Sequence, residues 1–310
     1  MSKILITGGA GFIASALAKK LAENKAHQIV IVDNLLTGSK VRIPKAENIN
    51  FIKADVNDYE AISSIFFRFS FDFVFHYAAV VGVERTLENP ILVLDDLKGM
   101  RNILDLSKNT LVKRVFFSSS SEVYGEPVEL PQNEHTTPLN SRLPYAIVKN
   151  VGEAFLKSYQ QEYGLDYTIF RFFNTYGPQQ SRDFVISKFV NAALKNETIP
   201  IYGDGSQTRT FCYVEDNVEA CIRTFSENKH INDVINIGSD KTYTVLELAK
   251  MIVKIANSKS KIIHLEPLKE GDMSRRQPDI SKMLRLLDRE LLSLEKGLEK
   301  VIENPSFFIE

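Results

Sequence analysis

The sequence predicts an α/β fold, a doubly wound parallel sheet joined to a smaller C-terminal α/β lobe. Through the N-terminal half, short apolar runs rich in Ile, Val and Phe alternate with helical stretches, which is the pattern of parallel strands with crossover helices. These runs lack strict alternation of apolar and polar residues, as expected for strands buried on both faces. After Asn174, turns containing glycine separate shorter elements, which predicts the smaller lobe.

The elements follow from these patterns in chain order. Strands of the sheet are predicted at Lys3–Thr7, Gln28–Asp33, Ile49–Lys53, Asp72–His76, Lys113–Ser118 and Asp166–Phe170. Helices between them are predicted at Phe12–Asn24, Asn57–Phe69, Pro90–Lys108 and Pro144–Tyr163. Further helices are predicted at Val185–Lys195, Asp216–Glu227, Val245–Ala256 and Ser281–Leu287. We expect a first domain over residues 1–174 and a substrate lobe over 175–310, parts of which return to the first domain.

Composition excludes several classes of partner. Thirty-eight basic and 39 acidic residues leave a net charge of −1, which gives no reason to expect nucleic acid or an anionic membrane. No run reaches the length of a transmembrane helix, and the first apolar run meets glycine too soon for a signal peptide. Cys212 and Cys221 show no metal-binding spacing, so we expect reduced core thiols, no metal site and a cytoplasmic protein.

A glycine-rich loop follows the first strand. Gly8 and Gly11 permit a tight turn and a close approach of the backbone to a pyrophosphate, and the helix that begins near Phe12 directs its positive N-terminal end at that charge. A lone glycine pattern is weak, but this one leaves a strand and opens a helix. The loop therefore predicts a dinucleotide site.

Asp33, at the end of the second strand, indicates which dinucleotide binds. A carboxylate there accepts hydrogen bonds from the adenosine ribose and repels a 2′-phosphate, so NAD is favoured over NADP. Lys40 and Arg42 lie near in sequence and could soften that preference. Asp55, after the third strand, either contacts the adenine amino group or caps the helix that follows Val56.

Further motifs resemble the extended short-chain dehydrogenase/reductase family, whose nucleotide-sugar epimerase/dehydratase branch matches best. The likeness covers nearly the whole chain and implies a Rossmann-like fold. One departure is Ala14, where the family usually has a third glycine. The motifs are Gly8-x-x-Gly11-x-x-Ala14, His76-Tyr-Ala-Ala79, Ser118-Ser-Ser-Ser-Glu-Val-Tyr-Gly125, Tyr145-Ala-Ile-Val-Lys149, Arg171-Phe-Phe-Asn-Thr-Tyr-Gly-Pro178 and Gly203-Asp-Gly-Ser-Gln-Thr-Arg209.

The Tyr145–Lys149 pair predicts acid–base chemistry. Residues four apart on a helix share a face, and an ammonium beside a phenol is expected to lower the pKa of the tyrosine. Tyr145 then takes the proton from a sugar hydroxyl while hydride leaves for the nicotinamide. By the resemblance, Lys149 also contacts the nicotinamide ribose and Ser120 orients the substrate.

The resemblance implies further binding residues. Asn174, Arg209 and one of Arg275 and Arg276 would grip the substrate's diphosphate and nucleoside, a task that suits the guanidinium fork. A homodimer through the helices at Pro90–Lys108 and Pro144–Tyr163, as a four-helix bundle, is also implied. Residues implied to contact the NAD cofactor are Gly8, Gly11, Phe12, Ile13, Asp33, Asn34, Asp55, Val56, Ala78, Ala79, Tyr145 and Lys149.

Glu122 bears on which reaction follows oxidation at C4 of the sugar. Related epimerases usually carry a small or uncharged residue at its position, whereas dehydratases and decarboxylases usually carry glutamate. Some other segments of the sequence resemble 4-epimerases, and others resemble UDP-glucuronate decarboxylases. We expect a UDP-sugar 4-epimerase, with 4,6-dehydration or UDP-glucuronate decarboxylation, using Glu122 as base, as the alternatives. Structurally, Glu122 could instead cap or pair with Arg85.

Two functions of other classes fit the sequence less well. A dinucleotide-binding regulator that has lost catalysis would be expected to lose Tyr145 or Lys149, and both are present. A reductase that uses exchangeable NADPH is disfavoured by Asp33.

Overall fold

The computed structural model describes residues 1–266 and 276–304, which form two compact units. The first unit comprises Met1–Val123, Ser141–Phe172 and Val218–Ile235, and the second comprises Tyr124–Asn140, Phe173–Asn217 and Asn236–Glu310. The chain therefore passes between the units several times. The assignment of residues 1–174 to the cofactor and 175–310 to the substrate stays a prediction.

A seven-stranded parallel sheet organises the first unit, in the order β11-β6-β5-β4-β1-β2-β3. The strand order reverses between β1 and β4, which is the place where open α/β sheets bind their ligands. This arrangement confirms the predicted Rossmann-like α/β fold. The strands are β1 (Ser2–Thr7), β2 (His27–Asp33), β3 (Ile49–Lys53), β4 (Phe73–His76), β5 (Arg114–Ser120), β6 (Asp166–Phe172) and β11 (Asp233–Ile237).

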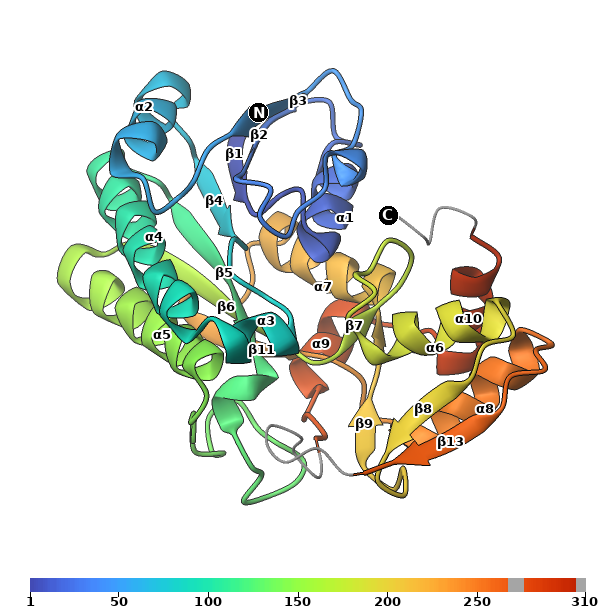
Figure 1. The fold of residues 1–310 in the computed structure, drawn as a ribbon. Helices are drawn as coiled ribbons and strands as arrows, with labels where there is room; N and C mark the ends of the chain where they lie inside the picture. Colours follow the sequence, from blue (N-terminus) through green and yellow to red (C-terminus); the bar gives the residue numbers. More distant parts are fainter. Residues whose placement is uncertain (267–275, 305–310) are drawn as a thin grey trace. The chain divides into compact units, whose positions relative to one another are not determined.

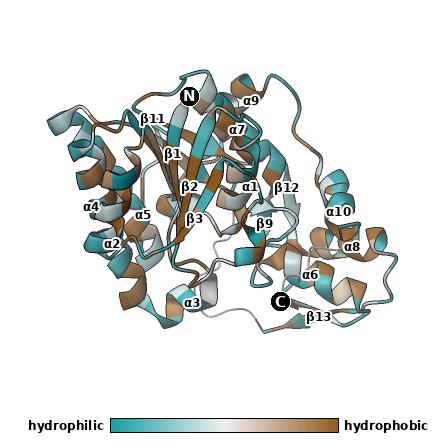
Figure 2. Cartoon of the chain, turned by 90° about the horizontal axis from the view of Figure 1, so that it is seen from above, coloured by the Kyte–Doolittle hydropathy of each residue, from teal (hydrophilic) through white to brown (hydrophobic). Residues whose placement is uncertain are grey.

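Helices cover both faces of this sheet (Figures 1 and 2). One face packs against α2 (Tyr59–Phe69), α4 (Pro90–Asn109) and α5 (Pro144–Tyr163), and the other against α1 (Phe12–Leu21) and α7 (Val214–Ser226). Three short helices join these elements. They are η1 (Lys40–Arg42), α3 (Val83–Glu88) and η2 (Ser121–Tyr124).

The core of the first unit has two layers. Aliphatic residues such as Val74 and Val115 pack against Leu104 of α4 and Leu156 of α5. On the opposite face the layer is aromatic, and Phe225 of α7 makes ring contacts with three phenylalanines of the sheet. These are Phe73, Phe75 and Phe116, with ring centroids 5.0, 5.8 and 5.9 Å away. Burial of both faces explains why the strands lack a polar–apolar alternation.

The described residues of the second unit form a core of their own and three two-stranded sheets. β13 and β8 run parallel, as do β10 and β7, whereas β12 and β9 are antiparallel. The strands are β7 (Thr175–Tyr176), β8 (Ile199–Tyr202), β9 (Thr208–Thr210), β10 (Cys212–Tyr213), β12 (Thr242–Thr244) and β13 (Ile262–Leu265). The helices are α6 (Val185–Leu194), α8 (Val245–Ile255), α9 (Ser281–Leu287) and α10 (Leu294–Ile302).

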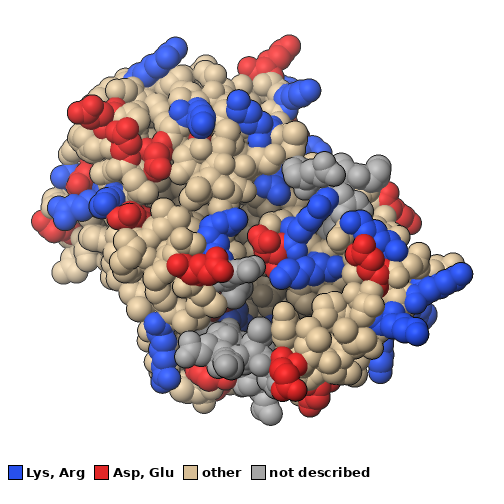
Figure 3. Space-filling view, in the orientation of Figure 1, with Lys and Arg blue, Asp and Glu red and all other residues tan. Residues whose placement is uncertain are grey.

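The surface charges and the two cysteines are as the sequence predicts. In Figure 3, acidic side chains lie among basic ones over the face that is drawn. Both Cys212 and Cys221 are buried free thiols, as predicted. Within the described part of the chain, no helix is long and apolar enough to cross a lipid bilayer.

Candidate active site

The candidate site of the first unit lies where β1 and β4 end, at the reversal of strand order. Thr7 and His76 are the last residues of these strands and are paired in the sheet. The Thr7 hydroxyl lies 2.8 Å from His76 Nδ1 and accepts hydrogen bonds from the backbone of Tyr77 and Ala78 at 3.2 and 3.3 Å. Thr7 thus fixes the segment that leaves β4 against the glycine-rich loop.

The glycine-rich loop has the features that a dinucleotide requires. Gly8 has a φ of 68°, and a Cβ there would lie 2.6 Å from the Ala78 backbone nitrogen. A Cβ on Gly11 would lie 2.9 Å from the Gly8 carbonyl oxygen. Gly11 is also the N-cap of α1 and supplies no side-chain cap, so the first turn, with Phe12 and Ile13, keeps its backbone donors for a phosphate.

Asp33 is tied to the same loop. Its carboxylate accepts hydrogen bonds from Ala10 N at 3.0 Å and Leu35 N at 2.7 Å, and only 8% of the residue is exposed. Burial raises the pKa of Asp33, while the two backbone hydrogen bonds and the charge of Arg42 oppose the rise. Whether Lys40 and Arg42 soften the preference for NAD over NADP stays a prediction.

Asp55 is placed beside Asn34 after β2 and β3. It accepts a hydrogen bond from the Asn34 amide at 2.9 Å and from Asn57 N at 2.8 Å. It does not cap the next helix, because the N-cap of α2 is Asp58, which accepts from Ala61 N at 3.1 Å. The capping alternative for Asp55 is therefore wrong, and its contact with adenine stays a prediction, as does that of the buried Val56.

Three of the four predicted catalytic residues, Ser120, Tyr145 and Lys149, lie at the end of β5 and the start of α5. Tyr145 lies in the first turn of α5 and shares a hydrogen bond with Ser120. Lys149 is 3% exposed, and its ammonium donates to the Ser118 carbonyl at 2.7 Å and to the Ser118 hydroxyl at 3.4 Å. Its Nζ lies 5.7 Å from the centroid of the Tyr145 ring. The packing of α5 on β5 thus brings Tyr145 and Lys149 close to serines that lie 25 or more positions earlier in the chain.

The titration of this pair differs from the expectation. The pKa of Tyr145 is raised, first because burial penalises the phenolate and then because of the negative charge of Glu122. The hydrogen bond with Ser120 acts in the opposite direction. The predicted lowering of the Tyr145 pKa is therefore wrong, because burial is the largest of the effects on this phenol. Burial lowers the pKa of Lys149 itself to about 8.

Glu122 lies in η2, two residues after Ser120, as the sequence places it. Its backbone N–H donates to the Ser120 hydroxyl at 3.2 Å. Its charge acts directly on Tyr145. The suggested partner Arg85 donates to the Val81 carbonyl at 2.9 Å, and pairing with Glu122 stays a prediction.

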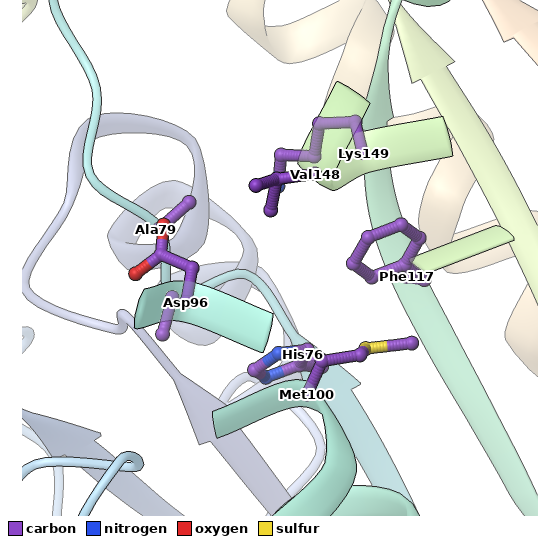
Figure 4. Close-up of a pocket in the computed structure, with 8 residues that line it drawn as sticks. His76, Ala79, Asp96, Met100, Phe117, Val148 and Lys149 are labelled. Atoms are coloured by element: carbon purple, nitrogen blue, oxygen red, sulfur yellow. The ribbon is translucent and has the colours of Figure 1, made fainter. Parts of the chain in front are cut away.

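A small pocket adjoins Lys149, and it contains residues that sequence reasoning missed (Figure 4). Asp96 of α4 and His76 of β4 line it together with Ala78, Ala79 and Lys149. His76 stacks on Phe117 with ring centroids 6.0 Å apart. His76 stood within a recognised motif, but no signal in the sequence singled out Asp96 from its neighbour Asp95. Only the packing of α4 beside α5 brings it to the site.

The predicted substrate residues lie in the second unit. The Asn174 amide donates to the Thr210 carbonyl at 3.1 Å, and Arg209 donates to the Thr208 carbonyl at 2.8 Å. Arg276 is 7% exposed. Arg275 falls outside the described residues. The contact of these residues with a nucleotide stays a prediction.

Comparison with known proteins places this site in a family. The model of the NAD dependent epimerase/dehydratase family matches residues 4–238. A provisionally named UDP-glucose 4-epimerase of Methanocaldococcus jannaschii is 39% identical over 96% of this chain and 97% of its own. The UDP-N-acetyl-alpha-D-glucosaminuronate decarboxylase of Bacillus cytotoxicus is 37% identical over 97% of each chain. The crystal structure of the Thermotoga maritima UDP-glucose 4-epimerase with UDP-glucose has a TM-score of 0.91 and 34% identity, over 97% of each chain.

The match covers most of the chain and includes the glycine loop, β5 and the start of α5. The chain belongs to the NAD-dependent epimerase/dehydratase family, and its cofactor is NAD.

Proposed function

We propose that this enzyme is a UDP-sugar 4-epimerase. The observation that carries the proposal is the Tyr145 phenol, hydrogen-bonded to Ser120 and set on the same helix as the buried Lys149. The similarity to the Thermotoga maritima 4-epimerase, solved with UDP-glucose, supports the nucleotide and the reaction.

The residues of the chain divide the work of the reaction. Bound NAD, held on the loop of Gly8 and Gly11 with Asp33 at its ribose, supplies the hydride acceptor and a positive charge. Tyr145 takes the proton of the C4 hydroxyl as the C4–H bond breaks, and Ser120 holds that hydroxyl. Lys149 adds a positive charge behind Tyr145 and so favours phenolate. The 4-keto sugar then turns over, C4 regains hydride on its other face, and Tyr145 returns the proton.

Binding of the substrate falls to the second unit in this proposal. Asn174, Arg209 and one of Arg275 and Arg276 would hold the UDP moiety, because the guanidinium fork matches a diphosphate. Holding the nucleotide while leaving the sugar free to rotate is what epimerisation requires, since hydride must reach both faces of C4.

Decarboxylation of a UDP-uronic acid is the second candidate, and Glu122 favours it. The Glu122 carboxylate acts on Tyr145, so it lies near the place where the sugar would react. Oxidation at C4 of a uronic acid gives a β-keto acid, which can lose carbon dioxide. A carboxylate there could equally remove the C5 proton of a hexose and expel water from C6. The similarity to the Bacillus cytotoxicus decarboxylase supports this candidate.

The test is a panel of UDP-glucose, UDP-N-acetylglucosamine, UDP-glucuronate and dTDP-glucose, with products read by mass spectrometry and NMR. An unchanged mass with a new C4 proton coupling supports the epimerase. A product lighter by about 44 Da, the mass of carbon dioxide, would refute the epimerase in favour of the decarboxylase. A product lighter by about 18 Da, the mass of water, would favour the dehydratase.

Two variants sharpen the panel. Tyr145→Phe should lower turnover by roughly 100-fold or more while NAD stays bound, because it removes only the acid–base hydroxyl. Glu122→Gln should leave epimerisation within about tenfold of the parent, whereas a decarboxylase or dehydratase that uses Glu122 as base would lose roughly 100-fold or more. Full activity of Tyr145→Phe would refute the assignment of Tyr145.

We further propose that the enzyme is a homodimer through α4 and α5, which pack side by side in the first unit (Figure 1). These helices leave apolar side chains exposed. The residues are Ile91, Leu92 and Leu94 of α4 and Ile147 and Tyr163 of α5. Pairing two copies would form a four-helix bundle and cover this surface.

A further inference from the structure

Asp96 is a half-buried carboxylate of α4 near Lys149. It projects from α4 into the same pocket that Lys149 reaches from α5 (Figure 4). The pocket holds about 10 Å³, near the volume that one water molecule requires. Of the residues that line the pocket, Asp96 is the acidic one and Lys149 the basic one. One acidic and one basic residue therefore line the same small pocket.

Asp96 also holds the segment that leaves β4. Its carboxylate accepts a hydrogen bond from the Val80 backbone N–H at 2.8 Å. Val80 directly follows Ala78 and Ala79, which also line the pocket. Ala78 in turn lies against Gly8 of the cofactor loop. One carboxylate thus connects α4 to the part of the backbone that we expect to face NAD.

Titratable side chains from several strands and helices surround the pocket, and their charges act on one another. Burial and the charge of Lys149 hold the pKa of His76 on β4 down at about 3, so His76 is neutral and cannot pair with either group. Glu122 after β5 and Asp96 on α4 both act on Tyr145 of α5. Burial raises the pKa of Asp96 itself, the hydrogen bond from Val80 and the charge of Lys149 oppose the rise, and the charges of Asp55 and Asp95 add to it. Burial lowers the pKa of Lys149, and the charge of Asp96 raises it in opposition.

We propose that Asp96 is a positioning residue for the reaction, whose carboxylate keeps Lys149 protonated and fixes the Ala78–Val80 segment beside the cofactor. The inference rests on the proposed role of Lys149 in supporting Tyr145. It makes Asp96 a determinant of the alkaline limit of activity. No group of this kind was expected from the sequence.

Two substitutions separate the charge from the hydrogen bond. Asp96→Asn keeps an acceptor for Val80 but removes the charge, so the alkaline limb of kcat/KM against pH should move about half a unit to one unit lower, with NAD affinity retained. Asp96→Leu removes the acceptor as well and should also weaken NAD binding by roughly tenfold. Asp95→Asn is the matched control, because it removes a neighbouring charge of α4 that pairs on the surface with Lys98 at 2.8 Å; its alkaline limb should move much less than that of Asp96→Asn.

A second experiment measures the titration of Lys149 directly and does not depend on catalytic activity. In the holoenzyme labelled with 15N-lysine, the Nζ signal that Lys149→Arg removes should titrate at lower pH in Asp96→Asn than in the parent. This decides the proposal even if none of the nucleotide sugars tested is a substrate. A Lys149 titration that is the same in Asp96→Asn, Asp95→Asn and the parent overturns it, whatever reaction the enzyme performs.

Discussion

At the scale of single residues, the ammonium of Lys149 is engaged by Ser118 rather than by Tyr145. A lysine has three N–H donors, and two of those of Lys149 point to the carbonyl and hydroxyl oxygens of Ser118. In the proposed mechanism, Lys149 therefore acts on Tyr145 through its charge and at a distance. A charge acts only while the proton is present, so the titration of Lys149 limits its usefulness.

The pH profile of the enzyme should show this limit. The pKa of Lys149 is lowered to about 8, so its positive charge is present below that pH and is lost above it. We expect kcat/KM to fall as the pH rises through about 8. In Lys149→Arg, whose guanidinium stays charged, the residual activity should not show this fall. The measurement is kcat/KM from pH 6 to 10 for both proteins, and an alkaline limb that persists unchanged in Lys149→Arg would assign it to another group.

Gly8 is the single backbone position on which the cofactor loop most depends. Gly8→Ala should abolish NAD binding, because the new Cβ would meet the Ala78 backbone at 2.6 Å at a positive φ. The control is Gly164→Ala at the end of α5, which has a similar φ of 71° but open space around a Cβ. Its cost should be about 1 kcal/mol of the free energy of unfolding. Retention of bound NAD by Gly8→Ala, read from absorbance and mass, would contradict the assignment of the loop.

The sequence allowed a role to be proposed for a residue where that residue lies in a local motif. Gly8, Asp33, Tyr145 and Lys149 could be proposed as site residues because each has a fixed place relative to a strand or a helix. Asp96 was not, since its importance comes from α4 lying against α5, a contact between distant parts of the chain. The direction of the Tyr145 pKa was also missed, because burial outweighs a charge four residues away on the same helix.

At the scale of elements, a buried ion pair connects the strands of the site to α5. Glu153, one turn after Lys149, accepts hydrogen bonds from Arg171 of β6 at 2.9 and 2.7 Å and from Ser119 of β5 at 2.6 Å. Both side chains of the pair are 2% exposed or less. This contact sets how α5 lies against β5, and so where Tyr145 and Lys149 stand relative to Ser120.

Breaking this pair should be costly. Glu153→Gln leaves the Arg171 charge buried without its counter-ion, so the free energy of unfolding should fall by about 3 kcal/mol. Glu23→Gln is the control, because Glu23 pairs with Lys20 on the surface, and it should cost at most about 1 kcal/mol. Chemical denaturation of both variants measures the difference. Equal effects would mean that the buried pair contributes no more than an exposed one.

The elements themselves were predictable to different degrees. The helix from Pro144 to Tyr163 was predicted at both ends, since Pro144 marks its start and Gly164 its C-cap. The seventh strand, β11, was missed, because it follows a helix that was assigned to the other lobe. Its place beside β6 depends on the chain returning to the first unit, which no local pattern encodes.

At the scale of the whole molecule, the apolar surface on α4 and α5 is the feature that a single chain leaves unexplained. Exposed apolar side chains are common singly, but here they recur on two neighbouring helices. Association through this face would also brace the helices that carry Asp96 and Lys149. The oligomer and the site would then be linked through the same two elements.

The proposed dimer predicts which surface substitutions separate the subunits. Leu94→Glu on α4 and Ile147→Glu on α5, each at a residue that is 38% exposed, should yield monomers, because both would bury unpaired charges at the interface. Phe67→Glu on α2 is the control: Phe67 is 66% exposed but lies on a helix outside the proposed bundle, so that variant should stay dimeric. Sedimentation velocity distinguishes the two states. A parent enzyme that sediments as a monomer, or equal dissociation of all three variants, would exclude α4 and α5 as the interface.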